Sequence, residues 1–210
     1  MTTPTANRAR PRIYLIRHGE TDWNAAARLM SRTDRPLNDV GEAQASALAA
    51  QLADLRWDRA FTSPLVRARR TAELVLAARG DAPALKRDDR LVEMDFGPYE
   101  GWTDAEVEAD PVAAISRRDG TGLPGGETQA LVEARARAFW ADIAELPGRT
   151  LVVSHGRTLR ILIATCVLGV PAALASRMRM RNCRPAIVEP GTPSLLLGLN
   201  MGAPEVDSLR

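Results

Sequence analysis

The chain has few of the residues on which several classes of function depend. Cysteine occurs only twice, as Cys166 and Cys183, which gives neither a metal-ligand spacing nor the dense pairing of a secreted disulfide scaffold. Aromatic residues make up 4% of the chain and the formal net charge is +2, so few side chains could stack on bases and little net charge attracts nucleic acid. We therefore expect no redox role for the cysteines and no nucleic-acid partner.

Long apolar segments are also missing. No stretch approaches the roughly 20 residues that a helix needs to cross a bilayer. Residues 1–12 are basic and contain proline, without the apolar segment of an export signal. We expect a cytoplasmic protein with no membrane partner, in which residues 1–11 form a flexible N-terminal extension and residues 12–210 form a single domain.

Strand-like and helix-like segments alternate along most of the sequence. Apolar, β-like runs at residues 13–16, 57–62 and 151–153 are separated by segments with helical spacing, and residues 186–189 and 195–199 are typical of closing strands. Such alternation predicts an α/β fold, a three-layer α/β/α sandwich with a mostly parallel central sheet.

The helix starts are predicted from capping residues. Asn38 and Thr128 can each cap an amphipathic helix, and Ser63 followed by Pro64 predicts a further start that places Arg67 in the first turn. The residues expected to face the core are Val40, Leu48, Leu52 and Leu55 in the first helix and Leu131, Phe139, Ile143 and Leu146 in the second.

The only two histidines stand in equivalent local settings. Arg17-His18-Gly19 follows the apolar run 13–16, and His155-Gly156 follows the run 151–153. The carboxyl ends of parallel strands meet at one edge of a sheet, where α/β folds place their active sites. The two His-Gly corners therefore predict one composite site.

Phosphoryl transfer requires a nucleophile, cations around the phosphate oxygens, and an acid for the leaving alcohol. His18 is the candidate nucleophile, because a neutral imidazole has an unprotonated nitrogen near pH 7. Arg17 and Arg67 can bind phosphate oxygens bidentately, and a protonated His155 would add a third positive group. Glu93 could protonate the leaving oxygen. Rate accelerations of up to ~10²¹, equivalent to roughly 29 kcal/mol, are known for the hydrolysis of phosphate monoesters. One positioned donor contributes only about 3 to 4 kcal/mol, so several groups must act together.

The order of these motifs resembles the histidine phosphatase superfamily, which includes the cofactor-dependent phosphoglycerate mutases. The resemblance covers residues 12 to about 200. It rests on Leu15-Ile16-Arg17-His18-Gly19-Glu20-Thr21-Asp22-Trp23-Asn24, Asp34-x-Pro36-Leu37, the helix start at 63–71, Leu91-x-Glu93-Met94-Asp95-Phe96-Gly97, Pro124-Gly125-Gly126-Glu127 and Val153-Ser154-His155-Gly156.

The resemblance implies a phosphoglycerate mutase-like fold and a role for each motif. His18 becomes phosphorylated, Glu93 is the proton donor, and no metal or cofactor is required. The remaining residues of the implied site are Arg17, Arg67 and His155 in the phosphate pocket, with Asn24, Thr33, Gly156 and Arg157 as further candidates for binding phosphate or substrate. A homodimer is an arrangement that the resemblance allows.

The segment after Glu93 separates the functional alternatives. Members that act as mutases resemble one another in a long insertion at this point, whereas here a compact stretch follows. We therefore expect a metal-independent phosphatase that acts on a small phosphorylated metabolite. A phosphoglycerate mutase-type phosphoryl transferase and a non-catalytic phospho-ligand-binding regulator remain as alternatives.

Arg157 departs from the family pattern, since phosphatases often have Gly there and mutases Asn. It could contact a second phosphate or a carboxylate of the substrate, or it could simply be solvated.

Overall fold

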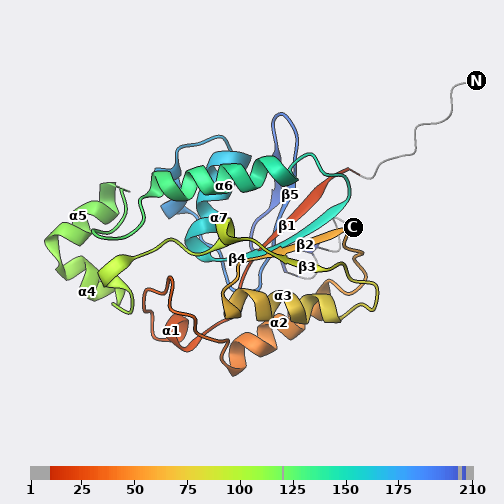
Figure 1. Ribbon diagram of the computed structural model, residues 1–210, viewed down its shortest axis with the longest axis horizontal. Coiled ribbons are helices and arrows are strands. Elements are labelled where there is room, and N and C mark those ends of the chain that lie inside the picture. Colours follow the sequence, from red (N-terminus) through yellow and green to blue (C-terminus); the bar gives the residue numbers. More distant parts are fainter. Residues whose placement is uncertain (1–9, 120, 203–204, 207–210) are drawn as a thin grey trace, which may run out of the picture.

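The computed structural model describes residues 10–119, 121–202 and 205–206, and a six-stranded sheet lies at its centre (Figure 1). The sheet order is β3-β2-β4-β1-β5-β6, and only β5 runs antiparallel to its neighbours. The strands are β1 (Arg12–Arg17), β2 (Arg59–Thr62), β3 (Leu85–Arg87), β4 (Arg149–Ser154), β5 (Ala186–Glu189) and β6 (Leu195–Gly198). This arrangement confirms the predicted α/β class and the mostly parallel sheet.

Helices cover both faces of the sheet. In Figure 1, α2 (Asp39–Gln51) and α3 (Val66–Ala77) lie below the sheet, and α6 (Gln129–Ile143) and α7 (Gly156–Leu162) lie above it. Alternate residues of β1 supply the two cores. Tyr14 and Ile16 belong to the cluster under α2 and α3, and Ile13 and Leu15 belong to the cluster under α6 and α7. A strand buried on both faces explains why residues 13–16 form an unbroken apolar run.

The pairing of β1 with β4 brings the two histidines together. In this parallel register Arg17 is opposite Ser154, so each strand ends just before its histidine. The His18 amide donates to the Ser154 carbonyl at 3.0 Å, which continues the ladder by one residue. The expected composite site thus lies at the carboxyl edge of the sheet.

Short elements surround that edge. They are α1 (Asp22–Ala25), the 3-10 turns η1 (Asp89–Leu91), η2 (Gly97–Tyr99) and η4 (Ala172–Arg177), the π-helical turn η3 (Ile163–Val167), and the helices α4 (Asp104–Ala109) and α5 (Pro111–Asp119). Figure 1 shows α4 and α5 projecting on the left, beyond the sheet. No helix in the described part of the chain is both long enough and apolar enough to span a membrane.

Two predicted core residues are on the surface instead. Val40 is 52% exposed and Leu131 is 60% exposed. Val40 lies eight positions before buried Leu48, and Leu131 lies eight positions before buried Phe139. In a helix of 3.6 residues per turn, this spacing places the two side chains of each pair roughly 80° apart around the helix axis. The residues seven positions before are Gly41 and Val132, and both are buried.

Two predicted element boundaries also shift. Helix α3 begins at Val66 and not at Pro64; its Leu65 cap makes no side-chain hydrogen bond, and Asp34 accepts from the Val66 amide at 2.6 Å instead. Strand β2 begins at Arg59 and not at Trp57, which packs in the core against Tyr14 just before the strand. The helical segment after His155 consists of α7 followed by the π-helical turn η3. Of the N-terminal extension expected over residues 1–11, residues 1–9 lie outside the described residues.

Candidate active site

His18 lies in the loop after β1 with a defined tautomer. Its Nδ1 is 2.7 Å from the Gly19 carbonyl oxygen. Because a carbonyl can only accept, Nδ1 donates its proton to this contact and Nε2 retains its lone pair. Gly19 is required where it stands, since a Cβ atom there would lie 2.6 Å from the carbonyl oxygen of Gly41 at the start of α2. The loop and the helix can therefore pack together only without a side chain at this position.

His155 follows β4 and is fully buried beside His18. The two ring centroids are 5.1 Å apart. His155 Nε2 lies 2.8 Å from the hydroxyl oxygen of Ser63, and its Nδ1 is buried without a hydrogen-bond partner. Ser63, which the sequence suggested as a helix cap, thus orients the second imidazole.

Burial keeps both imidazoles neutral. It lowers the pKa of His18 well below the ordinary value, and the positive charges of Arg67 and Arg17 lower it further. The pKa of His155 is lowered well below its ordinary value chiefly by burial and then by Arg67. A neutral His18 is the form that can act as a nucleophile.

The two pocket arginines are held by backbone carbonyls. Arg67 is fully buried, and its guanidinium donates to the carbonyl oxygens of Ser31 at 2.7 Å and Thr33 at 3.0 Å. Arg17 donates to the Met180 carbonyl at 3.0 Å. The Nε atoms of Arg17 and Arg67 are buried without a partner. Burial lowers the pKa of Arg67 to about 10, which leaves it charged at neutral pH.

Four buried side-chain nitrogens around the site have no hydrogen-bond partner. They are Nε of Arg17, Arg67 and Arg157, and Nδ1 of His155. Buried polar groups are normally paired, and unpaired ones call for an explanation. A bound oxyanion would provide acceptors for the guanidinium groups and for a protonated His155.

Glu93 is fixed against the first turn of α7. Its Oε1 accepts from the amides of Met94 at 2.9 Å and Thr158 at 3.1 Å, and its Oε2 accepts from the Arg157 amide at 3.1 Å. Glu93 also lines the same cleft as His18. The carboxylate is therefore positioned to exchange a proton with a group bound there.

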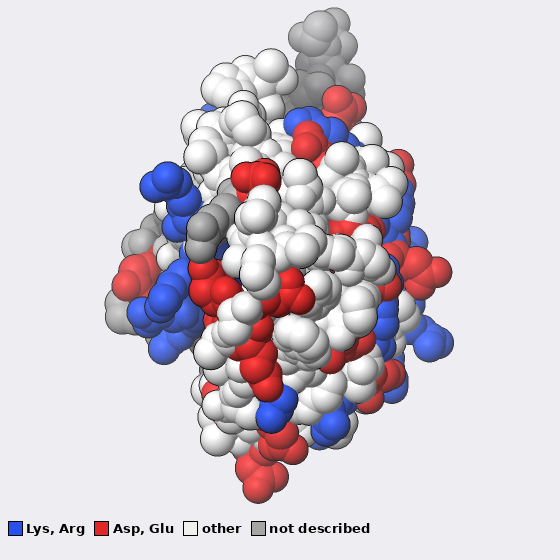
Figure 2. All heavy atoms as spheres, turned by 90° about the vertical axis from the view of Figure 1, so that its left-hand side faces the viewer, with Lys and Arg blue, Asp and Glu red and all other residues white. Residues whose placement is uncertain are grey.

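The site opens into a cleft of about 780 Å³. Its lining is strongly basic, with eight arginines against the two acids Glu93 and Asp104. The arginines are Arg17, Arg28, Arg117, Arg157, Arg160, Arg179, Arg181 and Arg184. Figure 2 shows the end of the molecule that carries α4 and α5; acidic side chains follow a vertical band across the middle of this face, and basic ones gather at its left edge. An anionic ligand is thus attracted to the cleft and repelled by the middle of the outer face.

The structure brings most of the predicted site residues together. Arg17, His18, Asn24, Glu93, Gly156 and Arg157 line the cleft, and buried Arg67 and His155 lie directly behind it in electrostatic contact with His18. Thr33 does not belong to this lining. Its side chain is exposed, and its backbone carbonyl holds Arg67.

Sequence reasoning missed several supporting groups. The Ser31 carbonyl anchors Arg67, and Asn182 Nδ2 donates to the His18 carbonyl at 2.7 Å. Neither contact has a local signal, because one is made by the backbone and the other joins residues 164 positions apart. Among the described residues, no cluster of three or more His, Cys, Asp or Glu side chains could hold a metal ion, and both cysteines are free thiols.

Comparison with known proteins agrees with this geometry. Residues 13–195 match the model of the histidine phosphatase superfamily (branch 1). The chain is 37% identical over 177 residues to a protein of Erwinia tasmaniensis described as "Probable phosphoglycerate mutase GpmB", and the match covers 81% of each chain.

Solved structures of phosphatases share the fold. The alpha-ribazole phosphatase from Shigella flexneri superimposes with a TM-score of 0.81 at 28% identity, covering 90% of this chain and 96% of that one. The mycobacterial glucosyl-3-phosphoglycerate phosphatase gives a TM-score of 0.81 at 28% identity, covering 92% and 100%. The chain therefore belongs to the histidine phosphatase superfamily, whose members include both phosphatases and mutases.

Proposed function

We propose that this protein hydrolyses a phosphate monoester of a small metabolite through a phosphohistidine on His18. The observation that carries the proposal is the hydrogen bond from His18 Nδ1 to the Gly19 carbonyl, which leaves the lone pair on Nε2 of a cleft-lining imidazole. Arg17, Arg67 and His155 surround this ring with donors whose buried nitrogens are partly unpaired. Together they supply a nucleophile and the positive charge that phosphoryl transfer needs.

In the first step Nε2 of His18 attacks phosphorus and the bond from phosphorus to the alcohol oxygen breaks. Arg17 and Arg67 bind the equatorial oxygens. The dianion counteracts the effect of these arginines on His155 and favours its protonated form. Glu93, in its protonated form, transfers its proton to the departing alcohol oxygen.

In the second step a water molecule attacks the phosphohistidine. Glu93, now ionised, accepts the water's proton, the bond from phosphorus to Nε2 breaks, and inorganic phosphate leaves with His18 restored. The size of the cleft supports this step, because about 780 Å³ is ample for water beside the substrate. A mutase has to exclude that water and retain the phosphoenzyme.

Phosphoglycerate mutase activity is the second candidate, favoured by the relative from Erwinia tasmaniensis at 37% identity. Incubation with 3-phosphoglycerate separates the two. Release of inorganic phosphate supports hydrolysis, whereas accumulation of 2-phosphoglycerate supports the mutase.

The decisive experiment is a phosphate-release screen over a panel of phosphorylated metabolites. His18→Ala should lower turnover by at least about 10⁴-fold, since removing a nucleophile abolishes the covalent route. Arg137→Gln, an exposed change on α6, is the matched control and should retain activity. A metal chelator should leave turnover intact. Persistent turnover in His18→Ala contradicts the mechanism, and phosphate binding with no release over the whole panel favours the non-catalytic regulator.

A further inference from the structure

Three arginines gather on one wall of the cleft, beside the phosphate pocket. Arg157 and Arg160 come from α7, and Arg117 comes from α5. All three line the cleft that contains His18 and Glu93. Burial lowers the pKa of Arg157 to about 10, and the positive charges of Arg160 and Arg117 lower it further.

Acidic side chains do not balance this charge. Among the residues that the structure describes, Asp104 and Glu93 are the only acids in the cleft lining. Asp104 pairs with Arg117 at 2.9 Å, and Glu93 accepts from backbone amides, including that of Arg157. Arg160 donates to the carbonyl oxygens of Gly156 and Met178.

Arg157 has a hydrogen-bond donor that is not used within the protein. Its Nε is buried without a hydrogen-bond partner. It also stands in the first turn of α7, where a cation is unfavourable against the helix dipole. A buried nitrogen without a partner is costly, and an anionic ligand in the cleft would supply the missing acceptor.

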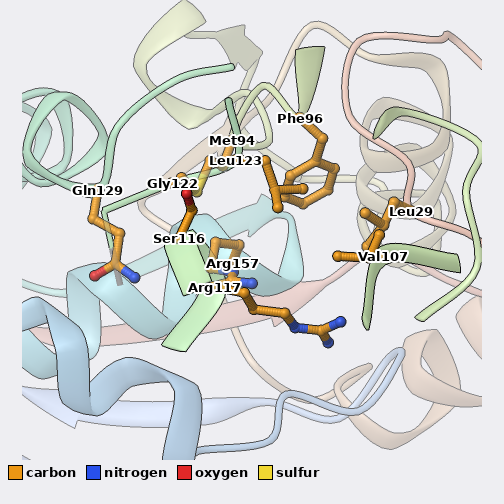
Figure 3. A pocket seen from close by; sticks show the side chains of 10 residues that line it. All are labelled: Leu29, Met94, Phe96, Val107, Ser116, Arg117, Gly122, Leu123, Gln129 and Arg157. Carbon is orange, nitrogen blue, oxygen red and sulfur yellow. The ribbon is translucent and has the colours of Figure 1, made fainter. Parts of the chain in front are cut away.

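The wall has an apolar side as well. Arg117 and Arg157 line a smaller pocket together with Leu29, Phe96 and Leu123. In Figure 3 the two arginines lie below Leu123 and Phe96. A carbon skeleton could rest on these apolar side chains while an anionic substituent faces the guanidinium groups.

We infer that Arg157, with Arg160 and Arg117, binds a second anionic group, a carboxylate or a second phosphate, on the leaving group of the substrate. The inference rests on the proposed function, because it names the class of ester that the same site accepts. Arg157 thereby determines specificity, and the pocket of Arg17, Arg67 and His155 binds the transferred phosphoryl group.

Binding measured without turnover tests the inference. In the His18→Ala background, calorimetry compares 3-phosphoglycerate with glycerol 3-phosphate, which has a hydroxymethyl group in place of the carboxylate. A second pair compares 1,3-propanediol bisphosphate with propyl phosphate. The pair in which the second anionic group increases the affinity more identifies that group as a carboxylate or a phosphate. Adding Arg157→Gln should weaken binding of the preferred doubly anionic ligand roughly 10- to 100-fold, and of its singly phosphorylated analogue by a much smaller factor.

Two controls separate a specific contact from the general field of the cleft. Arg181→Gln removes an exposed cleft arginine and should change the preference less than threefold. Arg157→Lys keeps the charge without the planar fork and should give an intermediate loss. Equal weakening of all four ligands by Arg157→Gln, or an equal shift of preference by Arg181→Gln, overturns the inference. Phosphate release by the wild-type enzyme is measured separately, and its absence would contradict hydrolysis but not the binding preference.

Discussion

The phosphate pocket and the cleft wall place arginines in opposite ways. In the pocket, Arg67 is fully buried and held by two backbone carbonyls. On the wall, Arg117 pairs with Asp104, and their side chains are 36% and 64% exposed. Arg67 is thus fixed before a ligand arrives, whereas Arg117 on the wall is held by a partly exposed ion pair. Preorganised donors contribute most to catalysis, and exposed ion pairs contribute little to stability.

This difference suggests a division of work. The dianion that reacts is the same for every phosphate monoester, so the groups that bind it can be rigid. Leaving groups differ, and the residues that bind them lie on α5 and on the first turns of α7, next to an open cleft. The following predictions test whether the two regions are as separate as their contacts indicate.

Among the variants that compare the two regions, the largest effect is expected for Arg67→Gln. The change removes a charged donor and leaves the carbonyls of Ser31 and Thr33 without it. We expect kcat/KM to fall about 10²- to 10³-fold for every substrate, because each depends on the same phosphoryl contacts. Phosphate release from glycerol 3-phosphate and from 3-phosphoglycerate measures it.

Arg70→Gln on the same helix is the matched control. Arg70 pairs with Glu42 on the surface, and its loss should change kcat/KM by less than about threefold. If Arg67→Gln affected only one class of leaving group, the pocket would also select substrates and the proposed separation would fail.

The pH dependence of stability gives the next effect. The pKa values of His18 and His155 are lowered well below 6.5, first by burial and then by the nearby arginines. In the unfolded chain both would protonate near that value. Below pH 6.5 the unfolded chain therefore binds more protons than the folded chain. As the pH is lowered below 6.5, the free energy of unfolding should decrease by up to about 1.4 kcal/mol per pH unit for each histidine.

Urea unfolding between pH 6.5 and 5.5 measures this slope. His155→Asn removes one of the two groups, so the slope and not the absolute stability is the quantity to compare. An unchanged slope would mean that burial does not hold His155 neutral in the folded protein.

The sequence predicted the reactive residues better than the contacts that hold them in place. The two histidines were found because each follows an apolar strand, and the parallel register of β1 with β4 brings His18 and His155 to one edge. The backbone contacts of Arg67 could not be predicted, because any residue type at positions 31 and 33 would supply the same carbonyl oxygens.

Periodicity failed for a related reason. Val40 and Leu131 share a spacing of eight residues from the buried positions Leu48 and Phe139, and apolarity alone does not show that a side chain has rotated onto the surface. Among the wall arginines, the sequence singled out Arg157 through its departure from the family pattern. Arg117 and Arg160 had no such signal, because their place in the cleft lining depends on tertiary packing and not on a local pattern.

The smallest effect is expected for Thr103→Ala, at the start of α4. Thr103 Oγ1 accepts from the Glu106 amide at 3.3 Å and Glu106 accepts from the Thr103 amide at 2.6 Å, so the change breaks a capping box and should cost about 1 kcal/mol. Faster hydrogen exchange in α4 would measure this. The inhibition constant of inorganic phosphate should stay within about twofold, because no α4 residue except Asp104 lines the cleft.

Asn38→Ala is the matched cap on the pocket side. Asn38 accepts from the Gly41 amide at 2.8 Å, and α2 begins against the loop that carries His18. Loss of this cap should cost a similar free energy and also weaken phosphate inhibition, since Gly19 packs on Gly41. If the two variants weakened phosphate binding equally, the wall and the pocket would be coupled, and selectivity could not change independently of the chemistry.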